Sequence, residues 1–267
     1  MTRTTTALAL ALSALATAAG AQATAQSTGT GDRFDWNGNV PAGAWIIVRN
    51  VSGPITVNAA SGRGASISGV KRVRRGDADF VRFYSRPLAN GGILVCALWG
   101  EDSSCDEDGA RSHNHNDRDH NDVSVDFTVS LPAGVNVRIG TVNGDAEVEG
   151  ATAEVEASTV NGEVRARSTG GPVRASTVNG DVRASMRSVG NDDLSYSTVN
   201  GSIELELPAS FNADVELSTV NGSFRTDFPM TLTGRVSPRR LSGKIGNGGR
   251  ELRARTVNGS IELRKSS

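Results

Sequence analysis

Aromatic residues are scarce in this sequence: Phe, Trp and Tyr together make up 4% of its 267 residues. This shortage argues against a bulky globular core, whereas 31 glycines and many small or β-branched residues favour thin β layers. An excess of charge of one sign is also missing, since 28 basic residues stand against 29 acidic ones. The balance gives no electrostatic reason to expect nucleic acid or an anionic membrane as a partner.

Long apolar runs are absent too, with one exception near the N-terminus. The run from Ala7 to Ala19 follows Arg3 and precedes Ala21-Gln22-Ala23, a small-x-small pattern. These features predict a secretory signal peptide over 1–23, because the run is too short to span a bilayer comfortably. The mature chain is then expected to have no membrane span and to lie outside the cytoplasm, in the periplasm, at the cell surface or in the medium.

The signatures of common enzymes are missing as well. The sequence contains no G-x-S-x-G, no H-E-x-x-H and no P-loop. Acidic residues on the expected strands are scattered along the chain, whereas cleavage of a polysaccharide needs acids gathered at one point. We therefore expect no catalytic residue, no cofactor and no enzymatic activity.

Cysteine and histidine are few, at two and three residues. Cys96 and Cys105 are expected to form a disulfide, because an even count in an exported protein favours pairing. All three histidines lie in a polar stretch, 101–121, and are His113, His115 and His120. Imidazoles beside carboxylates are candidate metal ligands, but a solvated polar loop has the same composition, so no metal is assigned.

The sequence is rich in one four-residue word, Thr-Val-Asn-Gly, which occurs six times. Successive copies are 18, 18, 21, 21 and 37 residues apart. A weaker match at Leu241–Ile245 would divide the last step into 21 and 16. Repetition at such a period is typical of stacked architectures, and it predicts about seven coils of roughly 20 residues.

Apolar and charged residues alternate between the copies, as in Ile203–Leu207, and a period of two indicates half-buried strands. Two folds fit this pattern. Asn-Gly could close two-residue hairpins in an antiparallel meander, or it could form the corner of coils that stack on one another. Because the whole word recurs and not only its turn residues, we expect an all-β, single-chain β-solenoid of the right-handed, parallel β-helix type, with coils of 18–21 residues.

Equivalent side chains of such a stack lie about 4.8 Å apart in columns. The valine of each word is expected to point inward, the asparagines to form an amide ladder, and the glycines to permit the corner. The expected ladder residues are Asn143, Gly144, Asn161, Gly162, Asn179, Gly180, Asn200, Gly201, Asn221, Gly222, Asn258 and Gly259.

The chain after the signal peptide divides into two regions. Region 24–131 continues the strand pattern without the word and contains the polar stretch 101–121, whereas region 132–267 holds the repeats. Val51-Ser52-Gly53 matches Val-Asn-Gly in frame, so the first region is expected to belong to the same stack.

These segments together resemble the DUF4097 family of predicted adhesins, also described as β-strand repeat-containing proteins. The resemblance rests on Val51–Val57, on Ile93–Leu98 with the following polar loop and second cysteine, on Asp122–Val135, and on the repeated word. It covers nearly all of the chain after the signal peptide. It implies a β-solenoid in a bacterial envelope or secreted protein, and it brings no catalytic residues with it.

Three functional hypotheses follow. The first is a non-catalytic, exported cell-envelope protein, an adhesin or a binding or scaffold module, that displays a repetitive β face to an envelope protein or a glycan. The second is a self-assembling structural element, because the ends of stacked sheets can add to one another. The third is a metal-binding or polysaccharide-acting β-helix protein. The sequence does not identify the partner.

Overall fold

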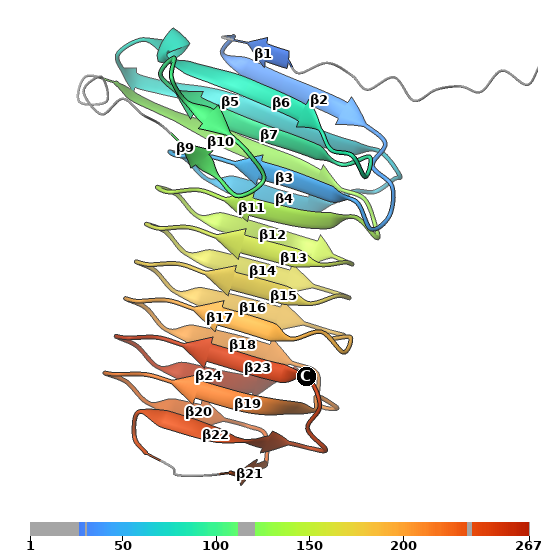
Figure 1. Cartoon of the computed structure of the whole chain (residues 1–267), viewed down its shortest axis with the longest axis vertical. Helices are drawn as coiled ribbons and strands as arrows, with labels where there is room; N and C mark the ends of the chain where they lie inside the picture. The colour runs from blue at the N-terminus through green and yellow to red at the C-terminus, as the bar shows by residue number, and fades with distance from the viewer. Residues whose placement is uncertain (1–26, 30, 112–120, 234–236, 267) are drawn as a thin grey trace, which may run out of the picture.

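The computed structural model describes residues 27–29, 31–111, 121–233 and 237–266. Two long sheets lie face to face in this part of the chain (Figure 1), and its helical structure is one 3-10 turn, η1, Ala78–Phe80. The expected all-β class is therefore confirmed. The strands are β1 Ser27–Gly29, β2 Arg33–Gly38, β3 Trp45–Arg49, β4 Ile55–Ala59, β5 Ala65–Arg75, β6 Val81–Pro87, β7 Ile93–Trp99, β8 Ser104–Cys105, β9 Ala110–Arg111, β10 Asp122–Leu131, β11 Asn136–Gly140, β12 Ala146–Ala151, β13 Val155–Ser158, β14 Val164–Ser168, β15 Val173–Ser176, β16 Val182–Met186, β17 Leu194–Ser197, β18 Ile203–Leu207, β19 Ala213–Ser218, β20 Phe224–Thr226, β21 Met230–Leu232, β22 Arg240–Ile245, β23 Glu251–Arg255 and β24 Ile261–Lys265.

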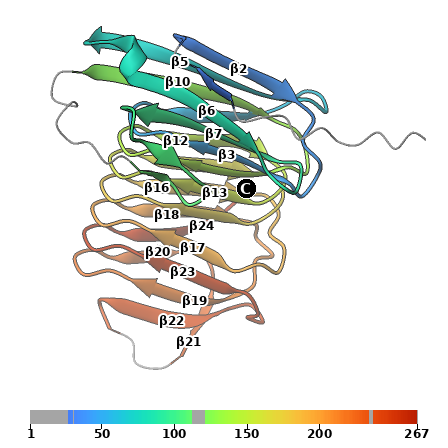
Figure 2. The ribbon, with the colours of Figure 1, turned by 45° about the horizontal axis from the view of Figure 1, so that its top comes forward.

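Sheet A orders its strands β1-β6-β7-β3-β11-β13-β15-β17-β23-β19-β22-β21, and sheet B orders them β2-β5-β10-β4-β12-β14-β16-β18-β24-β20. From β11 to β18 the chain alternates between the sheets, so each coil supplies one strand to each. Neighbouring coils pair in parallel and in register, as Val137, Val155 and Val173 do. Figure 2 shows the corners that join the two layers on both sides.

The main core lies between the sheets and consists mostly of Val, Ala, Ile and Leu side chains, with Tyr196, Phe83 and Phe127 as its largest fully buried members. Val155, Val164 and Val173 are fully buried there, as the alternation of apolar and charged residues predicts. The apolar side chains of a single coil would be open to solvent above and below it. Each coil therefore depends on its neighbours to bury its core residues.

The repeated word faces the core with its threonine and not with its valine. The six threonines are at most 5% exposed, whereas the six valines are between 36% and 48% exposed, so the expected inward valine column is wrong. The threonine hydroxyls donate to the glycine carbonyl of the neighbouring coil, for example Thr177 Oγ1 to Gly162 O at 2.9 Å. The physical reason is strand parity: apolar residues two and four positions before each threonine are already buried, so the valine next to it must point outward.

The asparagines and glycines form the corner itself. Each asparagine amide in the column bonds to the next, as Asn179 Nδ2 does to Asn161 Oδ1 at 2.8 Å. A Cβ placed on Gly180, whose φ is +155°, would lie 2.0 Å from Gly162 O. The word therefore requires glycine because two corners approach too closely for any side chain. The column begins at Ser52, which pairs with Asn143, in agreement with the frame of Val51-Ser52-Gly53.

The coils do not stack in chain order at the C-terminal end. The last coil, β23 and β24, lies between the coil of β17 and β18 and the coil of β19 and β20. Asn258 accordingly bonds to both Asn200 and Asn221. The weak repeat match Leu241–Ile245 lies in β22, which pairs antiparallel with β19 and β21, so it is not a seventh coil. Its glycine-containing word lacks the Thr and Asn that hold a corner.

The N-terminal end is closed by antiparallel strands that cover the first coil. In sheet B, β5 pairs antiparallel with both β2 and β10. In sheet A, β6 pairs antiparallel with β7. Next to these strands, sheet B continues into the repeats through the parallel pairs β10–β4 and β4–β12, and sheet A continues through the parallel pairs β7–β3 and β3–β11.

Candidate functional site

The outer faces of the two sheets differ in chemistry. On sheet B, Arg183 pairs with Glu163, with Asp181 at 2.9 Å and with Glu204 at 3.7 Å, and Arg264 pairs with Glu204 at 2.8 Å. These pairs run across several strands. Exposed pairs of this kind contribute little stability each, but they leave few charges free for a ligand.

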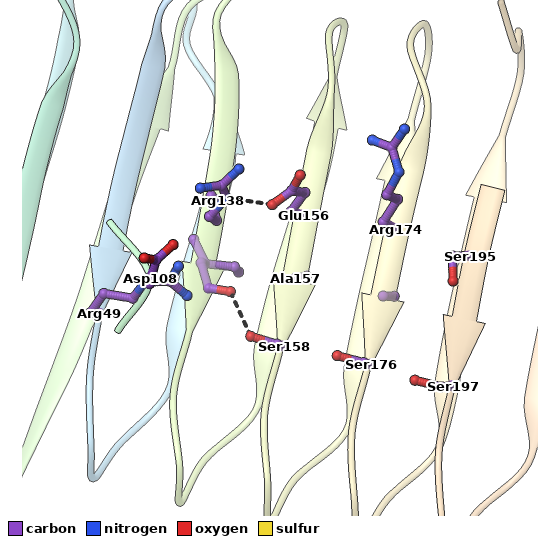
Figure 3. A pocket seen from close by; sticks show the side chains of 12 residues that line it. Arg49, Asp108, Arg138, Glu156, Ala157, Ser158, Arg174, Ser176, Ser195 and Ser197 are labelled. Atoms are coloured by element: carbon purple, nitrogen blue, oxygen red, sulfur yellow. Dashed lines mark hydrogen bonds and ion pairs between the residues drawn. The ribbon is translucent and has the colours of Figure 1, made fainter. Parts of the chain in front are cut away.

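Sheet A carries a groove of about 550 Å³ on its outer face (Figure 3). Its floor includes a column of small residues at the position just before each threonine. Ser158, Ser176 and Ser197 of three neighbouring strands line the groove, and Gly140 holds the same position on the adjacent strand β11. Parallel pairing in register places these residues side by side at the strand spacing of about 4.8 Å. The groove exists because larger side chains flank this column of small ones.

One wall of the groove is formed by the outward side chains two positions earlier on the same strands, and most of these side chains are charged. Arg138 pairs with Glu156, and its guanidinium lies 4.7 Å from the centroid of the Trp45 ring. Arg174 pairs with Glu154. Each of these two arginines therefore has a carboxylate partner within the protein.

Arg49 closes one end of the groove. Its Nη2 donates to the carbonyl oxygen of Glu107 at 2.5 Å, and its buried Nε has no hydrogen-bond partner among the described residues. A Cβ on Gly140 would lie 2.5 Å from Nη1 of Arg49 and 3.1 Å from Oγ of Ser158, so the missing side chain gives the guanidinium room beside the serine column. Burial, followed by the nearby charge of Arg138, lowers the pKa of Arg49.

The hydroxyls of the floor are largely unused inside the protein. Ser158 Oγ donates to Ile139 O over a long 3.4 Å, and among the described residues the hydroxyls of Ser176 and Ser197 have no partner. The same is true of Ser195, which lines the groove from the wall column. The arrangement offers donors and acceptors to a ligand, and it offers no nucleophile paired with a general base.

Among the described residues that the sequence singled out, the Asn-Gly words form the corners and the two cysteines lie in β7 and β8, and neither set lines this groove. The three histidines and the segment 1–23, for which a signal peptide is expected, lie outside the described residues. The Cys96–Cys105 pair is at bonding distance with Cα atoms 6.6 Å apart, and it ties β7 to the short β8–β9 hairpin. That hairpin brings Asp108 to the rim of the groove. The described part of the chain contains no group of three or more His, Cys, Asp or Glu residues that could hold a metal ion.

The groove itself was not anticipated from the sequence, although a signal for it exists. The residue before the threonine is Gly or Ser in the first five words of the sequence, and it is Arg255 in the sixth. Because the last coil stacks directly on Ser197, four small residues lie in a row and Arg255 follows them. Reading that single position down the repeats indicates a column of small outward residues with an arginine at its far end.

Two facing sheets of in-register coils, with a polar groove on one face, place the molecule among repetitive all-β proteins. The chain belongs to the Toastrack DUF4097 family, whose model matches residues 46–264. None of the curated proteins matches it. No helix in the described part of the chain is long and apolar enough to cross a membrane.

Two solved structures are similar to the chain at low identity. One is a putative cell adhesion protein from Clostridium sporogenes ATCC 15579, with 8% identity and a TM-score of 0.37, covering 88% of this chain and 100% of that one. The other is a putative adhesin from Bacteroides fragilis NCTC 9343, with 12% identity and a TM-score of 0.39, covering 86% of this chain and 96% of that one. Similarity at this level supports no argument about function.

Proposed function

We propose that this chain is a non-catalytic, exported binding module of the cell envelope, in which a right-handed β-solenoid displays a repetitive face to an adhesive partner or a glycan. The observation that carries the proposal is the sheet A groove with its row of hydroxyls, of which those of Ser176, Ser195 and Ser197 have no partner among the described residues. Export after removal of 1–23, and the division into 24–131 and 132–267, are parts of the proposal that rest on sequence.

A rigid display surface favours this role over catalysis. The groove is formed by neighbouring strands that pair in parallel and in register, so its side chains are held at fixed spacing. Preorganised polar groups lower the entropic cost of binding a ligand. The described groove holds no acid–base pair directed at a common point, which fits binding without reaction.

Self-assembly is the alternative proposal, and the open edges of the stack are the place to look for it. The last strands of the two sheets, β20 and β21, are three residues long each. Short edge strands reduce edge-to-edge association. The short strands at the C-terminal edge of the stack thus favour display over polymerisation.

A pair of tryptophan substitutions tests the proposal. Ser176→Trp fills the sheet A groove, whereas Ser185→Trp adds the same bulk to the outer face of sheet B. We expect the parent and Ser185→Trp proteins to bind on a glycan array and in a cell-adhesion assay, and Ser176→Trp to lose that binding. Folded parent protein that is negative in both assays, or a Ser176→Trp protein that binds like the parent, would refute the proposal.

A further inference from the structure

Arg49 differs from the other two arginines of the groove, because no carboxylate among the described residues forms an ion pair with it. Arg138 and Arg174 each pair with a glutamate, but Arg49 forms no ion pair among the described residues and donates only to a backbone carbonyl. The carboxylates of Glu156, Asp108 and Asp106 act on it through space, in that order of strength, without forming an ion pair. A guanidinium with free N–H groups at a groove end is a ready partner for a carboxylate, which it can bind with two parallel hydrogen bonds.

The serine floor leads directly away from that guanidinium. Arg49 Nη1 and Ser158 Oγ both lie within 3.1 Å of one point above Gly140, and the hydroxyls of Ser176 and Ser197 follow on the next two strands. The row from Gly140 to Ser197 spans three strand spacings, or about 14 Å. It is therefore long enough for a short linear ligand with polar groups along its length.

The composition of the groove selects a sugar chain over a peptide. Peptides that bind sheets add to a strand edge, where backbone groups are free, but this groove lies on the face of the sheet, where they are already bonded. Its floor presents hydroxyls and no apolar pocket for side chains. A hydroxyl-rich chain satisfies such a floor, because each sugar hydroxyl both donates and accepts.

We propose that the sheet A groove binds an acidic glycan, with a sugar carboxylate on Arg49 and sugar hydroxyls on Ser158, Ser176 and Ser197. This inference rests on the proposed function and adds the ligand class to it. Burial and then the charge of Arg138 lower the pKa of Arg49, and the carboxylates of Glu156, Asp108 and Asp106 raise it in part. A bound carboxylate would stabilise the charged guanidinium further.

The test uses the full chain and one glycan in two charge states, a short oligogalacturonate and its methyl ester, titrated by calorimetry. The backbone of the two probes is the same, so their difference isolates the carboxylates. We expect the acid form to bind at least about tenfold more tightly than the ester, a difference of about 1.4 kcal/mol. Added salt should weaken the acid form more than the ester.

Matched variants locate the two contacts. Arg49→Met should remove the preference for the acid form, and Arg49→Lys should keep part of it. Ser176→Ala should weaken acid and ester alike, by about the same factor. Arg167→Met, on the outer face of sheet B, should bind both probes like the parent. Thermal unfolding of each variant shows whether it is folded, and the acid–ester comparison on the parent needs no variant.

Several results would overturn the inference. They are equal binding of acid and ester, an Arg49→Met protein with the parent's preference, and an acidic peptide that displaces the glycan and binds more tightly. A failure of every carboxylated glycan on an array to bind would overturn it as well. Binding of neutral glycans that Ser176→Trp abolishes would leave the proposed function standing and remove only the ligand class.

Discussion

Replacing Ile261 by alanine probes the inserted last coil. Ile261 belongs to β24, is fully buried, and pairs with Ile203 on one side and Phe224 on the other. If the coils stacked in chain order, this residue would belong to the terminal coil and would be covered on one side only. The structure instead places it in the interior of the stack.

The expected cost follows from that burial. Ile→Ala removes three carbons, worth about 2.4 kcal/mol of transfer free energy at about 0.8 kcal/mol each, and the remaining cavity adds to it. We therefore expect Ile261→Ala to lower the free energy of unfolding by about 3–4 kcal/mol. Leu232, which lies in the true edge strand β21 and is 50% exposed, provides the control. Leu232→Ala should change stability by no more than about 0.5 kcal/mol.

Urea unfolding followed by circular dichroism measures both values. Repeat proteins can unfold in segments, so the unfolding transition of each variant should also be followed with a second probe. Coincident curves from the two probes show that the whole stack unfolds in one step. The reasoning would be refuted if Ile261→Ala cost less than about 1 kcal/mol, or if Leu232→Ala cost as much as Ile261→Ala.

Three further changes test other parts of the structure. Asn179→Ala removes two side-chain hydrogen bonds of the asparagine ladder and should lower the free energy of unfolding in urea by about 1–2 kcal/mol. Asn221→Ala removes one such bond and should cost about half as much, so equal effects would contradict the ladder. Bonds from the Gly249 N–H and then Lys244 lower the pKa of Asp214 below 3.8. Its carboxylate therefore stabilises the fold above that pH, and the loss in melting temperature of Asp214→Asn at pH 7 should shrink as the pH falls through 3.8 and below; a constant difference would exclude this account. Among the described residues, the buried Tyr196 hydroxyl has only Met186 Sδ as a partner, at 3.6 Å. Tyr196→Phe should therefore leave stability unchanged or raise it by up to about 1 kcal/mol, and a clear loss would show an unrecognised bond.

The sequence was sufficient for features that depend on local pattern. Alternation placed the strands, the repeat period placed the corners, and the recurrence of asparagine indicated a column of stacked amides. Predicting which residue of the repeated word faces the core needs one more step, because side chains of a strand alternate between its two faces. Val155 and Ala157 are buried, so the next inward position is Thr159. Hydrophobicity alone pointed Val160 inward, but parity points Thr159 inward, and the backbone follows parity.

The order of the coils could not be predicted from the same information. Every coil presents the same word to its neighbours, so Asn200 can stack equally well on Asn221 or on Asn258, and both steps keep the register. The choice depends on how the β21–β22 hairpin returns the chain, which is a long-range property. The groove was missed for a related reason, because its floor is one position read across four coils and not a motif along the chain.

Engineered cysteine pairs test most directly that coils stack in the observed order and register, on which both faces depend. Ser197 of β17 lies directly beside Arg255 of the inserted coil, and Ser218 lies beyond Arg255 on the next strand. Adjacent strands hold Cα atoms within disulfide range, whereas strands two spacings apart, at about 9.6 Å, exceed it. Mass spectrometry of the oxidised protein should find a disulfide in Ser197→Cys/Arg255→Cys and none in Ser197→Cys/Ser218→Cys. A disulfide in the second pair and not in the first would contradict the structure.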